Sequence, residues 1–167
     1  MRVFSAANRF GALALSLALL AGCASNDTTP EEEDEFAGVQ ERELYELART
    51  ALDSNRFPIA IERLEALDTR YPFGPHAEQA QLELIYAYYE NSNWEEARAA
   101  ASRFIRLHPD HPQVDYAYYL RGLSAWQAGR FSLERLRLID ISKRDLGASR
   151  DAYNDFRELI QRFPQSQ

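Results

Sequence analysis

Several features that small folds often depend on are scarce or missing in this sequence. It holds one cysteine in 167 residues, so a disulfide within the chain is excluded and a cysteine-based metal cluster is implausible. Long stretches in which apolar and polar residues alternate with period two are missing, which argues against a β-sheet. The seven glycines and seven prolines fall mostly at the ends of predicted helices. Since 46% of the residues are hydrophobic, the sequence predicts an all-α fold with an ample core.

Catalytic patterns are missing as well. The chain shows no Ser-His-Asp order, no glycine-rich phosphate loop and no reactive thiol, so we do not expect an enzyme. His108, Asp110 and His111 invite a metal-site interpretation, but two prolines interrupt the segment and no third nitrogen ligand is near. We interpret it as a turn between repeats, and we expect neither a metal nor a cofactor.

The first 22 residues have the pattern of a secretory signal. Arg2 and Arg9 supply positive charge, and the apolar run over 10–21 is too short to span a bilayer. The following Leu20-Ala21-Gly22-Cys23 resembles the site at which bacterial lipoproteins are cut and acylated. This resemblance implies cleavage before Cys23 and covalent lipid on it, which gives stable anchoring. An incidental cysteine behind an ordinary signal is the alternative.

The part that would remain after cleavage is acidic. Residues 1–22 contain two arginines and no acid, so the rest carries 17 Lys and Arg against 26 Asp and Glu, a formal charge of −9. This balance argues against nucleic acid as a partner. Residues 24–38 are polar with an acidic run at 31–35, and we interpret 23–40 as the lipidated cysteine with a disordered tether. An acidic recognition tail is the alternative for this segment.

A spacing of 37 residues recurs along the rest of the chain. The segment Arg70-Tyr71-Pro72-Phe73-Gly74-Pro75 stops one helix and starts the next, and His108-Pro109 with His111-Pro112 repeats it. The spacing predicts three helical hairpins over about 41–74, 75–111 and 112–167. The aligned positions are Ala48, Ile85 and Gly122 at close helix crossings; Phe57, Trp94 and Phe131 at the turn inside each hairpin; Ala60 and Ala97 early in the second helix; Leu67 and Phe104 later in it.

Local signals refine two helix starts. Pro58 is expected to open the second helix of the first hairpin as its first residue. Asn93 is expected to cap the corresponding helix of the second hairpin, with Glu96 completing an approximate capping box.

The third hairpin breaks the spacing. The aligned alanine is Ala152 rather than residue 134, and Phe156, Leu159 and Pro164 then follow it at the expected distances. We therefore predict an insertion over about 132–149 between the two helices of this hairpin. Insertions into repeats map to loops on one face.

The residue types at these offsets resemble the tetratricopeptide repeat. A single hairpin cannot bury its apolar stripe, so neighbours stack into a right-handed superhelix whose concave face binds segments of other proteins. The chain stops at Gln167 without the polar capping helix that a terminal repeat needs. We therefore expect it to be the N-terminal part of a longer protein.

A more specific resemblance covers essentially all of the chain after Cys23. The resemblance rests on the lipoprotein signal, the acidic tether and several further segments. These segments are Leu64-Glu65-Ala66-Leu67-Asp68, the segment over 70–75, Leu84-Ile85-Tyr86-Ala87-Tyr88-Tyr89, Arg103-Phe104-Ile105-Arg106-Leu107, Asp115-Tyr116, Arg121-Gly122-Leu123 and the inserted Asp140 to Asp145. Together they resemble the BamD family, lipoproteins of the machinery that folds β-barrel proteins into the outer membrane of Gram-negative bacteria.

The resemblance implies partners and sites. In that family the N-terminal repeats receive the C-terminal segment of unfolded barrel precursors, and later repeats contact the barrel subunit BamA within a larger complex. Tyr71 matches a family tyrosine tied to substrate recognition, and Phe73 lies beside it. Ala24, in place of aspartate after the cysteine, resembles the signal that sorts lipoproteins to the outer membrane.

Aromatic residues supply the candidate peptide-binding site. We select Tyr71, Phe73, Tyr86 and Tyr89, because an aromatic groove offers stacking and buried area to an apolar peptide. Packing between repeats is the alternative for each. Neighbours on a helix point about 100° apart, so adjacent rings such as Tyr118 and Tyr119 cannot both face the core.

The sequence thus predicts an outer-membrane lipoprotein that faces the periplasm and acts as a binding scaffold in β-barrel assembly. A scaffold for cell-wall or division proteins in the same compartment is the alternative. An enzyme of the envelope is a third class.

Overall fold

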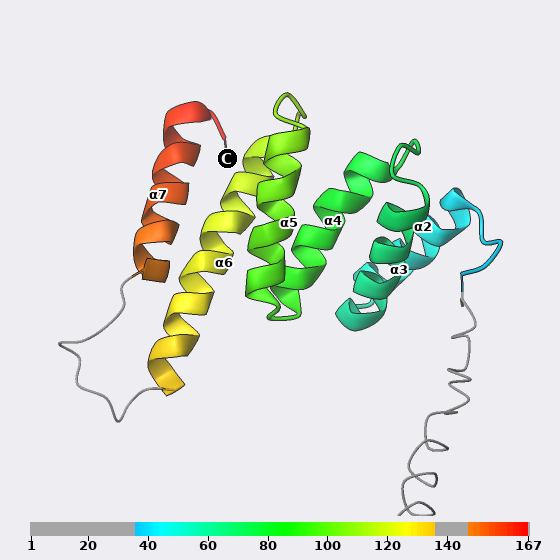
Figure 1. Cartoon of the computed structure of the whole chain (residues 1–167), viewed down its shortest axis with the longest axis horizontal. Coiled ribbons are helices and arrows are strands. Elements are labelled where there is room, and N and C mark those ends of the chain that lie inside the picture. Colours follow the sequence, from blue (N-terminus) through cyan, green and yellow to red (C-terminus); the bar gives the residue numbers. More distant parts are fainter. Residues whose placement is uncertain (1–35, 136–146, 167) are drawn as a thin grey trace, which may run out of the picture. The chain divides into compact units, whose positions relative to one another are not determined.

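The computed structural model describes residues 36–135 and 147–166 of the chain (Figure 1). The chain divides into two compact units, Met1–Ala37 and Gly38–Gln167, and only Phe36 and Ala37 of the first are described. The predicted signal, the predicted lipidation site Cys23, the predicted tether as far as residue 35 and residues 136–146 of the predicted insertion lie outside the described residues.

The second unit is a row of six helices over its described residues (Figure 1). Each helix packs against the next in the sequence, and α4 also packs against α6. No strand occurs in the described residues, so the all-α prediction with three hairpins is confirmed. None of the described helices combines the length and the apolar content that a membrane span requires. The helices are α2 (Glu41–Asp53), α3 (Phe57–Arg70), α4 (Ala77–Glu90), α5 (Trp94–Leu107), α6 (Val114–Arg135) and α7 (Gly147–Arg162).

The first two hairpins close with the same turn, 37 residues apart. Asn55 and Ser92 both adopt left-handed backbone, with φ of 55° and 64°. After each of them the next amide donates to the carbonyl five residues earlier, from Arg56 to Ala51 at 2.8 Å and from Asn93 to Tyr88 at 2.9 Å. This is the Schellman arrangement, which satisfies carbonyls that the helix end would leave unpaired.

The two junctions between hairpins also repeat each other. The Gly74 amide donates to the Tyr71 carbonyl at 3.0 Å, and the Ala77 amide donates to the Gly74 carbonyl at 3.1 Å. The same two bonds recur 37 residues later, at His111 and at Val114. Because these turns extend past Pro75, α4 begins at Ala77 and not at the proline, two residues later than the sequence predicts.

Two expected helix starts differ in detail from the structure. α3 begins at Phe57, one residue before Pro58. Asn93 does stand at the N-cap of α5, but its side chain makes no capping bond, so the predicted capping box is wrong. The reason is a competing donor: Asn93 Oδ1 accepts a bond from Asn91 Nδ2 at 2.6 Å.

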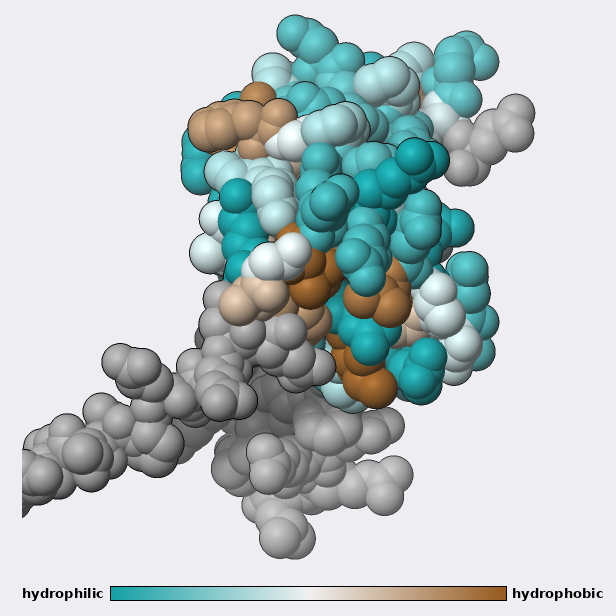
Figure 2. All heavy atoms as spheres, turned by 90° about the vertical axis from the view of Figure 1, so that its right-hand side faces the viewer, coloured by the Kyte–Doolittle hydropathy of each residue, from teal (hydrophilic) through white to brown (hydrophobic). Residues whose placement is uncertain are grey.

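The core lies along the aligned positions. Ala60, Ala97 and Ala152 are all buried, as the alignment of the three second helices predicts. Leu67 and Phe104, also aligned, are buried too. Small residues let the helices approach closely, and the larger ones fill the space between hairpins. Seen from the side of α2 and α3, the visible surface is mainly hydrophilic with small separate apolar patches (Figure 2).

The third hairpin is built differently. α6 is 22 residues long and continues to Arg135, four residues into the predicted insertion. α7 then begins at Gly147, also within that range. The helix pair packs closely, since a Cβ on Gly122 would lie 2.8 Å from the Phe156 ring and one on Gly129 would lie 3.2 Å from Ala148 Cβ.

Candidate functional site

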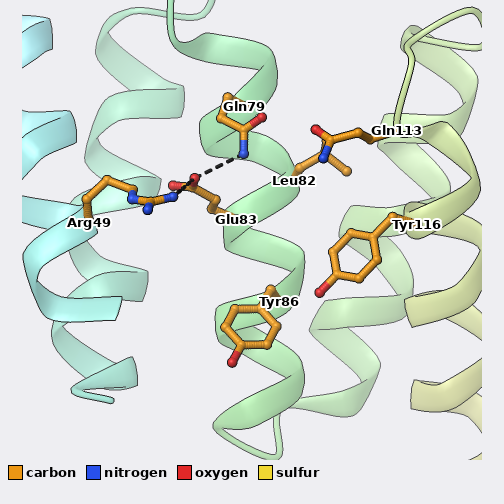
Figure 3. A pocket seen from close by; sticks show the side chains of 7 residues that line it. All are labelled: Arg49, Gln79, Leu82, Glu83, Tyr86, Gln113 and Tyr116. Atoms are coloured by element: carbon orange, nitrogen blue, oxygen red, sulfur yellow. Dashed lines mark hydrogen bonds and ion pairs between the residues drawn. The ribbon is translucent and has the colours of Figure 1, made fainter. Parts of the chain in front are cut away.

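A groove is formed where the first helices of the three hairpins meet (Figure 3). It encloses about 180 Å³, with α4 as its floor, α2 on one side and the start of α6 on the other. We call it the α2–α4–α6 groove. Its lining residues are Arg49, Gln79, Leu82, Glu83, Tyr86, Gln113 and Tyr116.

Glu83 is the centre of the polar side of this groove. Its side chain is only 9% exposed, although it is an acid on a helix that packs into the core. One carboxylate oxygen, Oε1, accepts three bonds: from Arg49 Nη1 at 2.7 Å, from the Tyr45 hydroxyl at 3.0 Å and from Gln79 Nε2 at 3.0 Å. These donors hold a buried charge that would otherwise be costly.

The network ties α2 to α4 and fixes Arg49 in place. The hydrogen bond and the charge of Glu83 raise the pKa of Arg49, which therefore stays a cation. Burial, followed by the nearby Glu83 carboxylate, raises the pKa of Tyr45 to about 12, so its hydroxyl remains a donor at physiological pH. Tyr45 is also stacked on His76, with ring centroids 4.6 Å apart.

The other side of the groove is aromatic. Tyr86 projects from α4 and Tyr116 from α6, and both rings border the hollow (Figure 3). Tyr86 also meets the edge of Phe57 at 6.1 Å between centroids. Burial raises the pKa of Tyr116 to about 12, with further contributions from Tyr86 and from the Glu90 carboxylate. Such a surface offers ring faces together with hydroxyl groups.

Of the four residues selected from the sequence, only Tyr86 lines this groove. Tyr89 is partly buried against a group of core residues that includes Ile85 and Phe104, and its hydroxyl accepts a long bond of 3.4 Å from Gln127 Nε2. Tyr71 is half-buried at the junction of the first two hairpins, where its hydroxyl donates to the Val39 carbonyl at 2.6 Å.

Phe73 has a different environment from Tyr71, although the two are near neighbours in sequence. Its side chain is 98% exposed, so packing between repeats is wrong as an explanation for this residue. Two prolines and Gly74 force a tight turn here, and the ring projects from it. Phe73 is therefore accessible, but it does not line the α2–α4–α6 groove.

Adjacent aromatic residues separate as their helical spacing predicts. Tyr118 is buried, with 3% exposure, and Tyr119 is 44% exposed. Tyr119 borders a second, larger hollow between α6 and the end of α7, together with Tyr116, Ile160 and Phe163.

Six of the seven lining residues were not selected from the sequence, among them Arg49, Glu83 and Tyr116. Glu83 carried a usable signal, because it lies three residues after Ala80 and four before Ala87, beside the apolar stripe of its helix. A charge at such a position needs a partner. The pairing with Arg49, 34 residues earlier, depends on how two hairpins stack, so no local pattern in the sequence predicts it.

The histidines at the second junction face an acid and an aromatic ring. His108 Nδ1 and His111 Nε2 lie 3.3 and 3.7 Å from the Glu78 carboxylate. Their rings also contact Phe104, with centroids 4.9 and 5.2 Å away. This packing agrees with a turn between repeats.

Comparison with known proteins finds relatives that share one name. The chain is 44% identical over 153 residues to outer membrane protein assembly factor BamD of Vibrio cholerae, covering 91% of this chain and 61% of that protein. It is 41% identical to the BamD of Neisseria meningitidis serogroup B, covering 92% and 58%. It is 34% identical to the BamD of Xylella fastidiosa strain Temecula1, covering 98% and 54%.

The chain thus spans less than two thirds of the length of each of these relatives. A family profile described as tetratricopeptide repeat matches residues 32–167, most of the chain. Together with the three stacked hairpins, this match shows that the chain belongs to the tetratricopeptide-repeat family.

Proposed function

We propose that this chain is the N-terminal, substrate-receiving part of an outer-membrane lipoprotein of the β-barrel assembly machinery. The observation that carries the proposal is the similarity, over about nine tenths of the chain, to proteins named outer membrane protein assembly factor. The stacked hairpins and their groove supply the binding surface that such a role needs.

In this mechanism the protein is a scaffold and performs no bond chemistry. An extended segment of an unfolded outer-membrane protein lies across α4, and its apolar side chains pack on Tyr86 and Tyr116. The buried Glu83 network keeps α2 and α4 at a fixed separation, so the groove is largely formed before the peptide arrives. Preorganisation of this kind lowers the entropic cost of binding.

Membrane attachment and partner subunits complete the proposal. Lipid on Cys23 would hold the repeats at the periplasmic face of the outer membrane, and BamA would be bound by other parts of the protein. Cys23→Ala is expected to leave the signal uncleaved and the protein unanchored. Normal outer-membrane fractionation of that variant would contradict the anchor.

A binding measurement tests the groove. The probe is a fluorescein-labelled ten-residue peptide of alternating apolar and aromatic residues from the C-terminus of an outer-membrane barrel, titrated with the full chain and followed by anisotropy. Tyr86→Ala and Tyr116→Ala are each expected to weaken binding about tenfold, because each removes a large apolar contact. Tyr153→Ala is the matched control, since Tyr153 is 64% exposed on α7 and does not line the groove.

Two results would count against the proposal. Equal affinity of all four proteins would remove the groove from substrate binding. Capture of only cell-wall or division proteins by the full chain in cells would favour a scaffold for those proteins.

A further inference from the structure

The α2–α4–α6 groove contains an acceptor that the free protein does not use. All three donors to Glu83 reach the same oxygen, Oε1. The second oxygen, Oε2, is buried and has no hydrogen-bond partner among the described residues. A carboxylate accepts donors on both oxygens, and a buried oxygen without a partner is destabilising. Such a group needs an explanation in a well-packed repeat.

The charges around the groove are unbalanced. Arg49 is the one cation among the described residues that line it, and it faces Glu83 at 2.7 Å and Asp53 at 3.9 Å. The exposed Glu90 carboxylate acts on the opposite side, where it helps to raise the pKa of both Tyr86 and Tyr116 after burial. Arg49 and Glu83 balance each other within the lining, so the excess negative charge near the aromatic surface comes from Asp53 and Glu90, which lie outside the lining.

This combination favours a cation with an apolar stem. An ammonium or guanidinium group donates strongly to a carboxylate, and its aliphatic stem packs against ring faces. A carboxylate on the ligand could not donate to Glu83 Oε2, and Arg49, the cation of the lining, is already paired with Glu83. A purely apolar ligand would leave Glu83 Oε2 without a partner.

We propose that the groove selects extended segments in which a Lys or Arg side chain is flanked by apolar residues, and that this cation donates to Glu83 Oε2. The inference rests on the proposed function, since it specifies the peptide class bound there. The cation's stem lies along Tyr86 and Tyr116. Glu83 and Glu90 are seven residues apart, about 10 Å along the helix, so one cation contacts Glu83 while Glu90 adds longer-range attraction.

Binding requires one local rearrangement. Because Oε2 is closed to solvent in the free protein, an incoming donor reaches it only after a neighbouring side chain moves. Gln79 is a neutral donor bonded to Oε1, so losing its bond would cost less than the charge-assisted bond that the cation makes to Oε2 contributes. Arg49 and Tyr45 remain bonded to Oε1.

The test compares three peptides that differ at one position. Each is the same labelled ten-residue apolar and aromatic peptide, with lysine, norleucine or glutamate at its centre, titrated with the full-length lipoprotein in detergent. We expect the lysine peptide to bind about tenfold more tightly than the norleucine peptide, and the glutamate peptide to bind most weakly. Glu83→Gln is expected to abolish the preference for lysine over norleucine.

Further variants keep the test decisive if Glu83→Gln loses helicity. Glu90→Gln, at an exposed position, is expected to reduce the preference about twofold in low salt. Gln79→Ala keeps the carboxylate and is expected to preserve or increase the preference. Glu62→Gln removes the same charge from an exposed position on α3 and is expected to change nothing.

The outcomes separate the two proposals. Equal binding of the lysine and norleucine peptides to the wild type overturns the selection of cations and leaves the peptide groove intact. A preference that survives in Glu83→Gln overturns the role of Oε2. Binding of none of the three peptides overturns the proposed function itself.

Discussion

The second and third hairpins place different structures at equivalent positions. In the second hairpin, Ser92 ends α4 with left-handed backbone, although serine has no special tolerance for it. Gly129 lies 37 residues later and would fit that conformation best, yet it is inside the continuous helix α6. The glycine serves close packing instead, because it closely approaches Ala148 of α7.

The two second helices are also held by different forces. α5 follows a short turn and buries Ala97, Ala101 and Phe104. Among the described residues of α7, only Ala152 is buried to that degree. Ion pairs join α7 to both of its neighbours: Arg98 of α5 pairs with Asp151 at 2.9 Å, and Arg121 of α6 pairs with Asp155 at 2.7 Å and with Glu158 at 3.0 Å. α5 has one such pair with an earlier helix, between Arg103 and Asp68 at 2.6 Å. A hairpin without a short turn thus relies on side-chain contacts to place its second helix.

The largest effect is expected from adding a side chain at Gly122, where α6 closely approaches the Phe156 ring of α7. A Cβ at position 122 would lie 2.8 Å from the Phe156 ring, so Gly122→Val forces the ring to move, and we expect it to destabilise the protein by about 3 kcal/mol. Urea unfolding measures the change. Gly129→Ala is the matched control, because its 3.2 Å approach to Ala148 is looser and alanine favours the helix, so we expect a change within about 1 kcal/mol. A loss of stability below about 1 kcal/mol in Gly122→Val would show that the contact between Gly122 and Phe156 does not hold α7 in place.

The next effect concerns the ion pairs of α7. Arg121 and Asp155 are 16% and 15% exposed, and Arg121→Met leaves the acid buried without its cation. We expect a loss of about 2 kcal/mol at pH 7. Arg162→Met removes a pair whose arginine is 60% exposed and is expected to cost less than about 0.5 kcal/mol.

The pH dependence of that loss has a definite sign. Burial raises the pKa of Asp155, and Arg121 opposes the shift. Without Arg121 the folded-state pKa rises further above the unfolded value, so protonation favours the folded variant and the loss shrinks as pH falls toward 4. Unfolding free energies of both proteins at pH 7 and pH 4 measure this. A loss that grows on acidification would contradict the assignment.

A smaller, opposite effect is expected at the turn of the second hairpin. Ser92→Gly relieves left-handed backbone at φ 64° and should stabilise the protein by about 1 kcal/mol. Asn55→Gly at the equivalent turn should gain less, because asparagine tolerates this conformation. Thermal unfolding of the two variants compares them, and equal gains would mean that residue type does not matter at these turns.

The smallest effect is expected at the first junction. Tyr71→Phe removes the bond to the Val39 carbonyl, and we expect a loss of about 0.5 kcal/mol because the ring is only half-buried. Peptide affinity measured on the same variant separates the two explanations for Tyr71. An unchanged affinity would assign the hydroxyl to its structural bond with the Val39 carbonyl. A large loss of affinity with unchanged stability would assign it to substrate contact.

The local part of the fold could be predicted because its signals are local. Pro72 and Pro109 mark helix ends at a fixed spacing, and small residues such as Ala60 and Ala97 mark close helix contacts. The end of α6 could not be predicted from that spacing. Gly129 is compatible with a turn and with a tight helix contact, and the neighbouring helix decides between them.

The candidate site was predicted less well, for a related reason. Aromatic residues suggested peptide binding, and Tyr86 does line the groove. Arg49 and Glu83 lie in separate hairpins, so their 2.7 Å contact depends on how the hairpins stack. Phe73 and Tyr71 are two residues apart but differ in exposure because the tight turn directs their side chains differently.

Site-specific photo-crosslinking in cells from position 116 of the full-length protein, followed by identification of what is trapped, would show whether the groove receives barrel precursors. Position 62, exposed on α3 and outside the groove, is the control. We expect unfolded outer-membrane barrel precursors in adducts from position 116 and far fewer from position 62. Precursors trapped equally from both positions, or only cell-wall and division proteins trapped from position 116, would contradict substrate binding in the groove.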